Sequence, residues 1–116
     1  MAELRKTVTI FMSTDELNEK NVKKPDGCPM TKYYRDLVRE GWKYKDELNF
    51  NERVVIKDKG FWAHITIFLP LAEAREHDEI RTKGKGYRGK MPMTTFYLQL
   101  VRIGWRHKFE TSKPSP

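Results

Sequence analysis

An internal repeat constrains the fold of this chain more than any other feature. Residues 29–47 align with residues 92–110 without a gap, and 11 of the 19 aligned residues are identical. Upstream, the Val-Thr-Ile-Phe segment at 8–11 returns as Ile-Thr-Ile-Phe at 65–68. The offset is 57 residues in the upstream segment and 63 in the downstream one. Solenoids need about three or more units to stack, so two copies predict a duplicated half-domain that closes on itself.

Each copy is predicted to contain a strand, a basic loop, a helix and a second strand. Residues 7–12 and 64–69 are rich in the β-branched and aromatic side chains that strands favour. Short second strands are expected at 42–45 and 105–109. Together these segments predict a β-α-β unit that occurs twice.

The predicted helices carry matching signals at both ends. Thr31 and Thr94 are the expected N-caps, because a threonine oxygen can accept a hydrogen bond from an unpaired amide in the first turn. Gly41 and Gly104 stand where a left-handed C-terminal cap is wanted. The apolar side chains that repeat at helical spacing are Tyr34, Leu37, Val38, Tyr97, Leu100 and Val101.

Between the copies, two apolar runs at 53–57 and 61–63 flank a glycine-containing turn and predict a β-hairpin. The resulting β-α-β-β-α-β order is the ferredoxin-like, or split βαβ, arrangement of the α+β class. In that fold the strands at 7–12 and 64–69 are antiparallel neighbours about a pseudo-twofold axis. Both helices then cover one face of the sheet.

One domain is expected over residues 1–110, with one copy at about 7–47 and the other at about 64–110, followed by a flexible tail at 111–116. No apolar run reaches the roughly 18 residues of a membrane span. A single cysteine and the lack of a signal peptide predict a cytoplasmic protein. The histidines have no metal-ligand spacing, and we expect neither metal nor cofactor.

The net charge of +7 predicts a polyanionic partner, either nucleic acid or an acidic protein surface. Strand parity places a core set toward the helices, namely Val8, Ile10, Met12, Ile65, Ile67 and Leu69. The opposite, open face is then expected to carry Thr7, Thr9, Phe11, His64, Thr66 and Phe68. Cations from the second strands are expected to border it, namely Lys43, Lys45, Arg106 and Lys108.

A basic, glycine-rich loop at 81–90 precedes the second helix and contains the additional residues of copy two. Glycines let a backbone approach phosphate closely, so we expect this loop to become ordered on a polyanion. Its candidate binding residues are Lys83, Lys85, Tyr87, Arg88 and Lys90. With the open face, the loop predicts a non-enzymatic protein that binds single-stranded nucleic acid or another phosphate-rich ligand.

The predicted layout resembles the RNA-recognition-motif proteins, and Lys59-Gly60-Phe61 is similar to the start of their longer motif. This resemblance implies base stacking on the two central strands. A second resemblance is His64-Ile65-Thr66-Ile67 to the His-x-Thr motif of the two-histidine phosphoesterases. It implies acid–base chemistry at His64 with Thr66 on a phosphate oxygen, but Thr7 stands where the second histidine belongs.

The helices of the two copies differ in a way that favours an alternative function. Leu98 and Ile103 replace Arg35 and Glu40 of copy one, which predicts an exposed apolar strip. Such a strip would suit a protein-interaction module, such as a phage-like inhibitor or adaptor on an acidic partner, alone or as a homodimer. A degenerate phosphoesterase-like domain is the second alternative.

Overall fold

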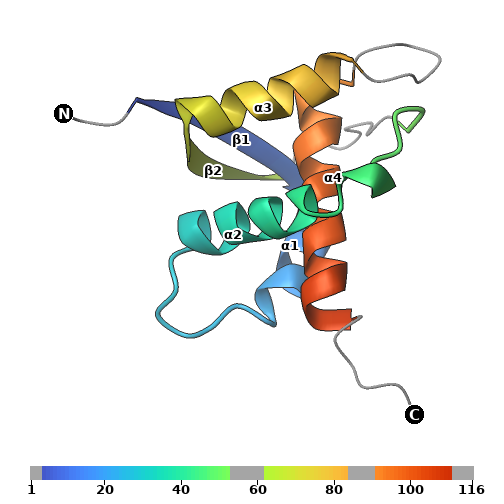
Figure 1. Ribbon diagram of the computed structural model, residues 1–116. Coiled ribbons are helices and arrows are strands. Elements are labelled where there is room, and N and C mark those ends of the chain that lie inside the picture. The colour runs from blue at the N-terminus through green and yellow to red at the C-terminus, as the bar shows by residue number, and fades with distance from the viewer. Residues whose placement is uncertain (1–3, 53–61, 84–90, 111–116) are drawn as a thin grey trace.

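The computed structural model describes residues 4–52, 62–83 and 91–110, and in them a strand–helix–helix unit occurs twice (Figure 1). The elements are β1 (Arg5–Ser13), α1 (Thr14–Asn21), α2 (Met30–Trp42), β2 (Trp62–Pro70), α3 (Leu71–Thr82) and α4 (Met93–Trp105). The fold is of the α+β class, as expected. The four-stranded ferredoxin-like sheet is not seen in the described residues, where the sheet has two strands.

The two strands form an antiparallel ribbon with one strand from each copy. Thr9 lies opposite Thr66, and these two residues are also equivalent in the repeat. The pseudo-twofold axis therefore passes between them, and the predicted pairing of the two strands is confirmed. Alternating β-branched side chains explain the strands, because one face of each can be buried while the other stays polar.

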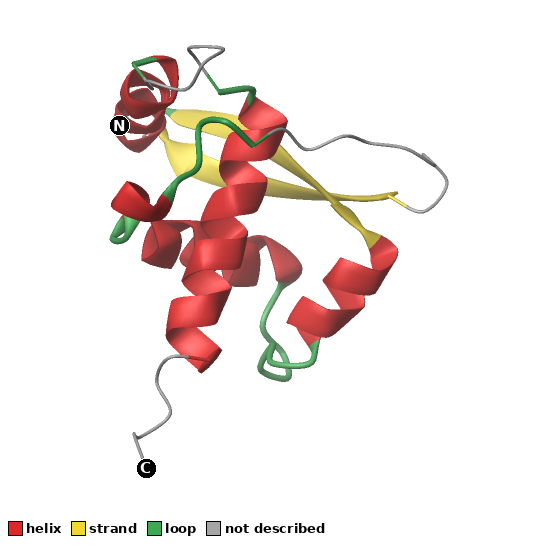
Figure 2. Ribbon diagram, turned by 90° about the vertical axis from the view of Figure 1, so that its right-hand side faces the viewer, coloured by secondary structure: helices red, strands yellow, loops and turns green. Residues whose placement is uncertain are grey.

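Helices α1 and α3 occupy segments that were predicted to be loops. Ser13 caps α1, because its Oγ accepts a hydrogen bond from the Glu16 amide at 3.1 Å. Pro70 ends β2 and is the N-cap residue of α3. Since the strands are antiparallel, α1 and α3 leave from opposite ends of the ribbon (Figure 2).

Both longer helices are confirmed, but their predicted caps are wrong. The N-cap residues are Pro29 and Pro92, and neither makes a side-chain capping bond. Thr31 and Thr94 lie inside the first turn instead. A proline at this point fits because the first helical amides lack an intrahelical partner in any case.

Gly41 and Gly104 are not left-handed caps, and they lie within α2 and α4 where the two helices cross. A Cβ on Gly41 would lie 2.1 Å from the Leu100 carbonyl oxygen, and one on Gly104 would lie 2.0 Å from that of Leu37. Glycine is required here by the close approach of the two backbones. The identical contact on both sides shows that the helix pair follows the same pseudo-twofold axis as the ribbon.

The predicted second strands are wrong. Trp42 and Trp105 are the last residues of α2 and α4, and short helical turns follow at Lys45–Glu47 and Arg106–Glu110. Because Gly41 and Gly104 are not in the left-handed conformation, each helix continues through its glycine to the tryptophan. The predicted hairpin and the Lys59-Gly60-Phe61 motif lie outside the described residues, apart from Trp62 and Ala63 at the start of β2.

The core lies between one face of the ribbon and the crossing pair α2 and α4. All six strand residues expected in the core are buried, and so is the repeated stripe of both helices. Trp42, Trp105 and Leu17 pack at its margin. The parity argument therefore assigned the two faces of the ribbon correctly.

Candidate nucleic-acid interface

The uncovered face of the ribbon carries the six side chains that strand parity placed there. Thr7, Thr9, His64, Thr66 and Phe68 are exposed, and Phe11 is half-buried. The two strands contain no Asp or Glu, so this face has no carboxylate of its own. It is a narrow, polar and partly aromatic surface to which the two strands contribute no negative charge.

Cross-strand pairs order the side chains on this face about the pseudo-twofold axis. Thr9 and Thr66 form the central pair, and Thr7 lies opposite Phe68 at one end. At the other end Phe11 lies opposite His64, with ring centroids 4.7 Å apart and planes at 68°. This edge-on contact is a favourable aromatic geometry that orients the imidazole. The two ends of the face are therefore chemically different.

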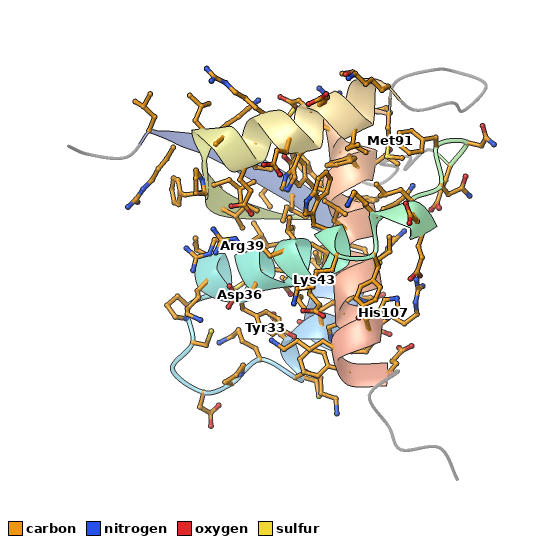
Figure 3. All side chains as sticks on the ribbon, viewed as in Figure 1. Tyr33, Asp36, Arg39, Lys43, Met91 and His107 are labelled. Atoms are coloured by element: carbon orange, nitrogen blue, oxygen red, sulfur yellow. The ribbon has the colours of Figure 1, made fainter. Side chains whose placement is uncertain are left out.

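A hollow of about 330 Å³ borders the Thr7 end of the face and gathers three arginines. It is lined by Arg5, Thr31, Arg35, Arg39, Phe68 and Pro70. The Arg39 guanidinium points toward α3 (Figure 3), where it donates two hydrogen bonds to the Glu73 carboxylate at 2.9 and 3.0 Å. Arg5 has no acidic partner among the described residues and is available to an anion at this end.

The four cations expected to border the face lie elsewhere. Lys43 and Lys45 follow α2, and Arg106 and Lys108 follow α4, so none belongs to a strand. Lys43 pairs with Glu40 at 3.1 Å, and Arg106 pairs with Glu47. These residues were misplaced because the turns after the helices were taken for flanking strands.

The basic loop is described only at its beginning. Arg81 lies in the last turn of α3, donates a hydrogen bond to the Met91 carbonyl at 2.9 Å and pairs with Asp78 at 3.3 Å. Lys83 pairs with Glu79 at 2.7 Å. The other candidate residues, Lys85, Tyr87, Arg88 and Lys90, lie outside the described residues. Their role in binding stays a prediction.

The prediction of an exposed apolar strip on the second helix is wrong. Leu98 is 0% exposed and Ile103 is 4% exposed, so both are core residues. Helix α4 packs against α2 and β1. The Gln99 side chain also holds the backbone of Asn49, accepting from its amide at 2.8 Å and donating to its carbonyl at 2.9 Å. Burial on several sides explains why α4 is more apolar than α2.

Among the described residues of the open face, His64 has no partner for acid–base catalysis. Thr7, its equivalent in the repeat, lies four positions away along the ribbon, opposite Phe68. His77 is buried in the core, and His107 lies in the turn after α4. Among the described residues, no three His, Cys, Asp or Glu side chains form a group that could hold a metal ion.

Sequence reasoning missed the arginines of the hollow. Arg5 shares strand parity with Thr7 and Thr9, which was a usable signal, but the strand was taken to begin two residues later. Arg35 was noted only as the charged counterpart of Leu98, and Arg39 was not singled out. Only the tertiary structure brings their face of α2 beside the end of the ribbon.

Comparison with protein-family models, with curated proteins and with solved structures found no match for this chain. Within the described ranges, no helix has both the length and the apolar character needed to cross a membrane.

Proposed function

We propose that this protein binds double-stranded DNA by placing its two-stranded ribbon in the major groove. The observation that carries the proposal is the ribbon's uncovered face, which is polar, lacks carboxylates and has helices packed on its other side. Known β-ribbon DNA-binding proteins use strands in this way.

The width of the ribbon favours duplex DNA over the single-stranded nucleic acid that was expected from the sequence. Neighbouring strands lie about 4.8 Å apart, and the major groove of B-DNA is about 12 Å wide and admits a two-stranded ribbon. A four-stranded sheet spans about 14 Å between its outer strands before side chains are added, so it would not enter. Among the described residues of the face, Phe68 is the one exposed phenylalanine, because Phe11 is half-buried and in edge-on contact with His64.

The side chains of the face suit the edges of base pairs. Threonine hydroxyls can donate to or accept from base edges, and threonine methyls can contact the thymine methyl group. Thr7, Thr9 and Thr66 supply both groups along the length of the ribbon. The His64 imidazole can donate to purine acceptors such as guanine N7. Phe68, which is 41% exposed, adds an apolar surface for a thymine methyl.

Charge supports the same partner. The chain has a net charge of +7, and both strands lack acidic residues that would repel phosphates. Arg5 and the hollow beside it lie where the DNA backbone would flank the groove. Because bound cations displace counterions from DNA, the affinity should fall steeply as salt rises.

The test is a fluorescence-anisotropy titration of the whole chain against a random-sequence duplex and the matching single strand. The T9E/T66E variant places two carboxylates at the centre of the face, on exposed residues whose replacement leaves the core intact. We expect the native chain to prefer the duplex and the variant to lose about tenfold or more in affinity.

Val22→Glu is the matched control. Val22 is 78% exposed in the turn after α1, and the change adds one carboxylate away from the strands, so it is compared with each single variant, T9E and T66E. We expect it to bind nearly as well as the native chain. No duplex binding at low salt, a preference for the single strand, or equal loss in both variants would each overturn the proposal.

A further inference from the structure

The two halves of the ribbon share one backbone arrangement. Thr9 and Thr66 are both register partners and repeat equivalents, and Gly41 and Gly104 make the same close contact on either side of the helix crossing. A symmetric DNA-binding surface normally matches a palindromic site, because the twofold axis of the protein coincides with that of the DNA. The scaffold alone would therefore fit two identical half-sites.

The side chains on this scaffold do not repeat. Thr7 at one end of the face is equivalent to His64 at the other, and Arg5 is equivalent to Trp62. Threonine offers a hydroxyl and a methyl group, whereas histidine offers a ring N–H donor and an aromatic edge. The contact of His64 with Phe11 has no counterpart at the other end, where Phe68 lies opposite Thr7.

The flank of the face differs as well. The hollow beside Thr7 contains Arg5, Arg35 and Arg39, and the equivalent positions at the other end are Trp62, Leu98 and Arg102. Two of three cations are thus replaced by apolar residues, of which Leu98 is buried. We therefore expect stronger phosphate attraction beside the Thr7 end, chiefly through Arg5. Such an imbalance would give the protein a preferred direction on DNA.

We infer that a single chain recognises a non-palindromic DNA site, with one half contacted by Thr7 and Phe68 and the other by Phe11 and His64. This inference rests on the proposed function and specifies its ligand. One molecule occupies one site, because each half of the ribbon already comes from one copy of the repeat. The histidine half prefers purine acceptors, and the threonine half tolerates or prefers thymine.

The test begins with repeated selection from a random duplex library using the whole chain. We expect an enriched motif whose two halves differ, bound as one chain per duplex in light scattering. His64→Thr makes both ends carry threonine and should make the two selected halves more alike. It should also lower affinity for the original motif by about tenfold, a typical loss for one base contact.

The swapped variant T7H/H64T is the sharper control, because its composition and its charge are unchanged. The histidine-dependent base pairs should move to the other half of the selected motif, beside the end that carries Arg5. Circular dichroism melting should show that these exposed substitutions leave the fold intact. Duplex binding with a symmetric motif, with no enriched motif, or with a motif unchanged by His64→Thr would overturn this inference. The complete absence of duplex binding would instead overturn the proposed function.

Discussion

Arg102 and Glu16 are 86 positions apart in the chain, yet the guanidinium donates two hydrogen bonds to the carboxylate at 2.7 and 2.9 Å. Arg39 and Glu73 form the equivalent pair with the roles of the copies exchanged. Each pair joins the second helix of one copy to the first helix of the other. The repeat is therefore closed by reciprocal ion pairs as well as by the ribbon.

Arg102→Ala should lower the free energy of unfolding by about 1 kcal/mol at neutral pH, since Arg102 is only partly buried. Burial acts to raise the pKa of Glu16, but the hydrogen bonds and charges of Arg102 and, to a smaller extent, Lys20 together outweigh it, so the pKa lies below the ordinary 4.5. A lowered pKa in the folded state gives stability that is lost as the pH falls through that pKa.

Urea unfolding at about pH 7 and about pH 3 measures this effect. The difference between the native chain and Arg102→Ala should shrink at the lower pH, as Glu16 becomes protonated. Lys32→Ala breaks an exposed pair with Asp36 and should cost less than about 0.5 kcal/mol. An equal cost for both variants at neutral pH would argue against a structural role for the Arg102 pair.

Gly104→Ala should destabilise the protein by about 3 kcal/mol, although alanine normally favours a helix over glycine. The added Cβ would meet the Leu37 carbonyl oxygen at 2.0 Å, and this oxygen belongs to backbone that cannot move aside alone. Gly27→Ala is the control, because Gly27 has a φ of 80° but open space around it. Its cost should be about 1 kcal/mol. Thermal melting that ranks Gly27→Ala as the more damaging change would contradict the described helix crossing.

Acid should destabilise the protein through His77. This side chain is fully buried, its Nδ1 lies 3.1 Å from the Tyr97 hydroxyl, and its Nε2 has no hydrogen-bond partner among the described residues. Burial lowers the pKa of His77 below the ordinary 6.5; Glu73 and Asp78 act against this shift, and Arg39 adds to it. The unfolded chain therefore binds the proton more readily, and stability falls as the pH drops below 6.5.

His77→Gln should flatten this dependence between about pH 8 and about pH 5, because glutamine does not titrate. It should also cost about 1–2 kcal/mol at neutral pH through altered packing. His64→Gln makes the same change on the exposed face and is the control for the substitution itself. If the slope persists in His77→Gln, another group governs the acid sensitivity.

Leu98→Arg should unfold the protein or cost more than about 3 kcal/mol, because it puts a charge into a fully buried site. The matched control is the reverse substitution at the equivalent position of copy one, where Arg35 is partly exposed. Arg35→Leu should change stability by about 0.5 kcal/mol or less. Urea unfolding of both variants checks the assignment of Leu98 to the core, and similar costs would refute it.

Much of the fold could be predicted because the strands and the longer helices carry strong periodic patterns. Strand parity separated buried Ile10 from exposed Thr9 correctly, and the repeat located the pseudo-twofold axis. The role of Gly41 could not be read locally, because a glycine at a helix crossing and one at a helix end look the same in sequence. Because Gly41 was predicted to end the helix, the turn that follows it was wrongly predicted to be a strand.

The missed helices have weaker but recognisable signals. Ser13 followed three residues later by Glu16 is the sequence signature of a capped helix start, and α1 begins there. Its residues are mostly polar, so no apolar stripe marked it. At the candidate site, strand parity predicts the residues of the face. The position of Arg35 and Arg39 depends on the packing of α2 beside the ribbon, which the sequence does not indicate.

The pairing of β1 with β2 brings together one strand from each copy, so neither copy contains a complete ribbon. When two halves are separate molecules, the amount of assembled protein depends on the square of the monomer concentration. Here the halves are covalently joined, and their encounter is intramolecular. Assembly is then independent of dilution, and occupancy of a binding site would rise in direct proportion to the number of chains, even when few are present.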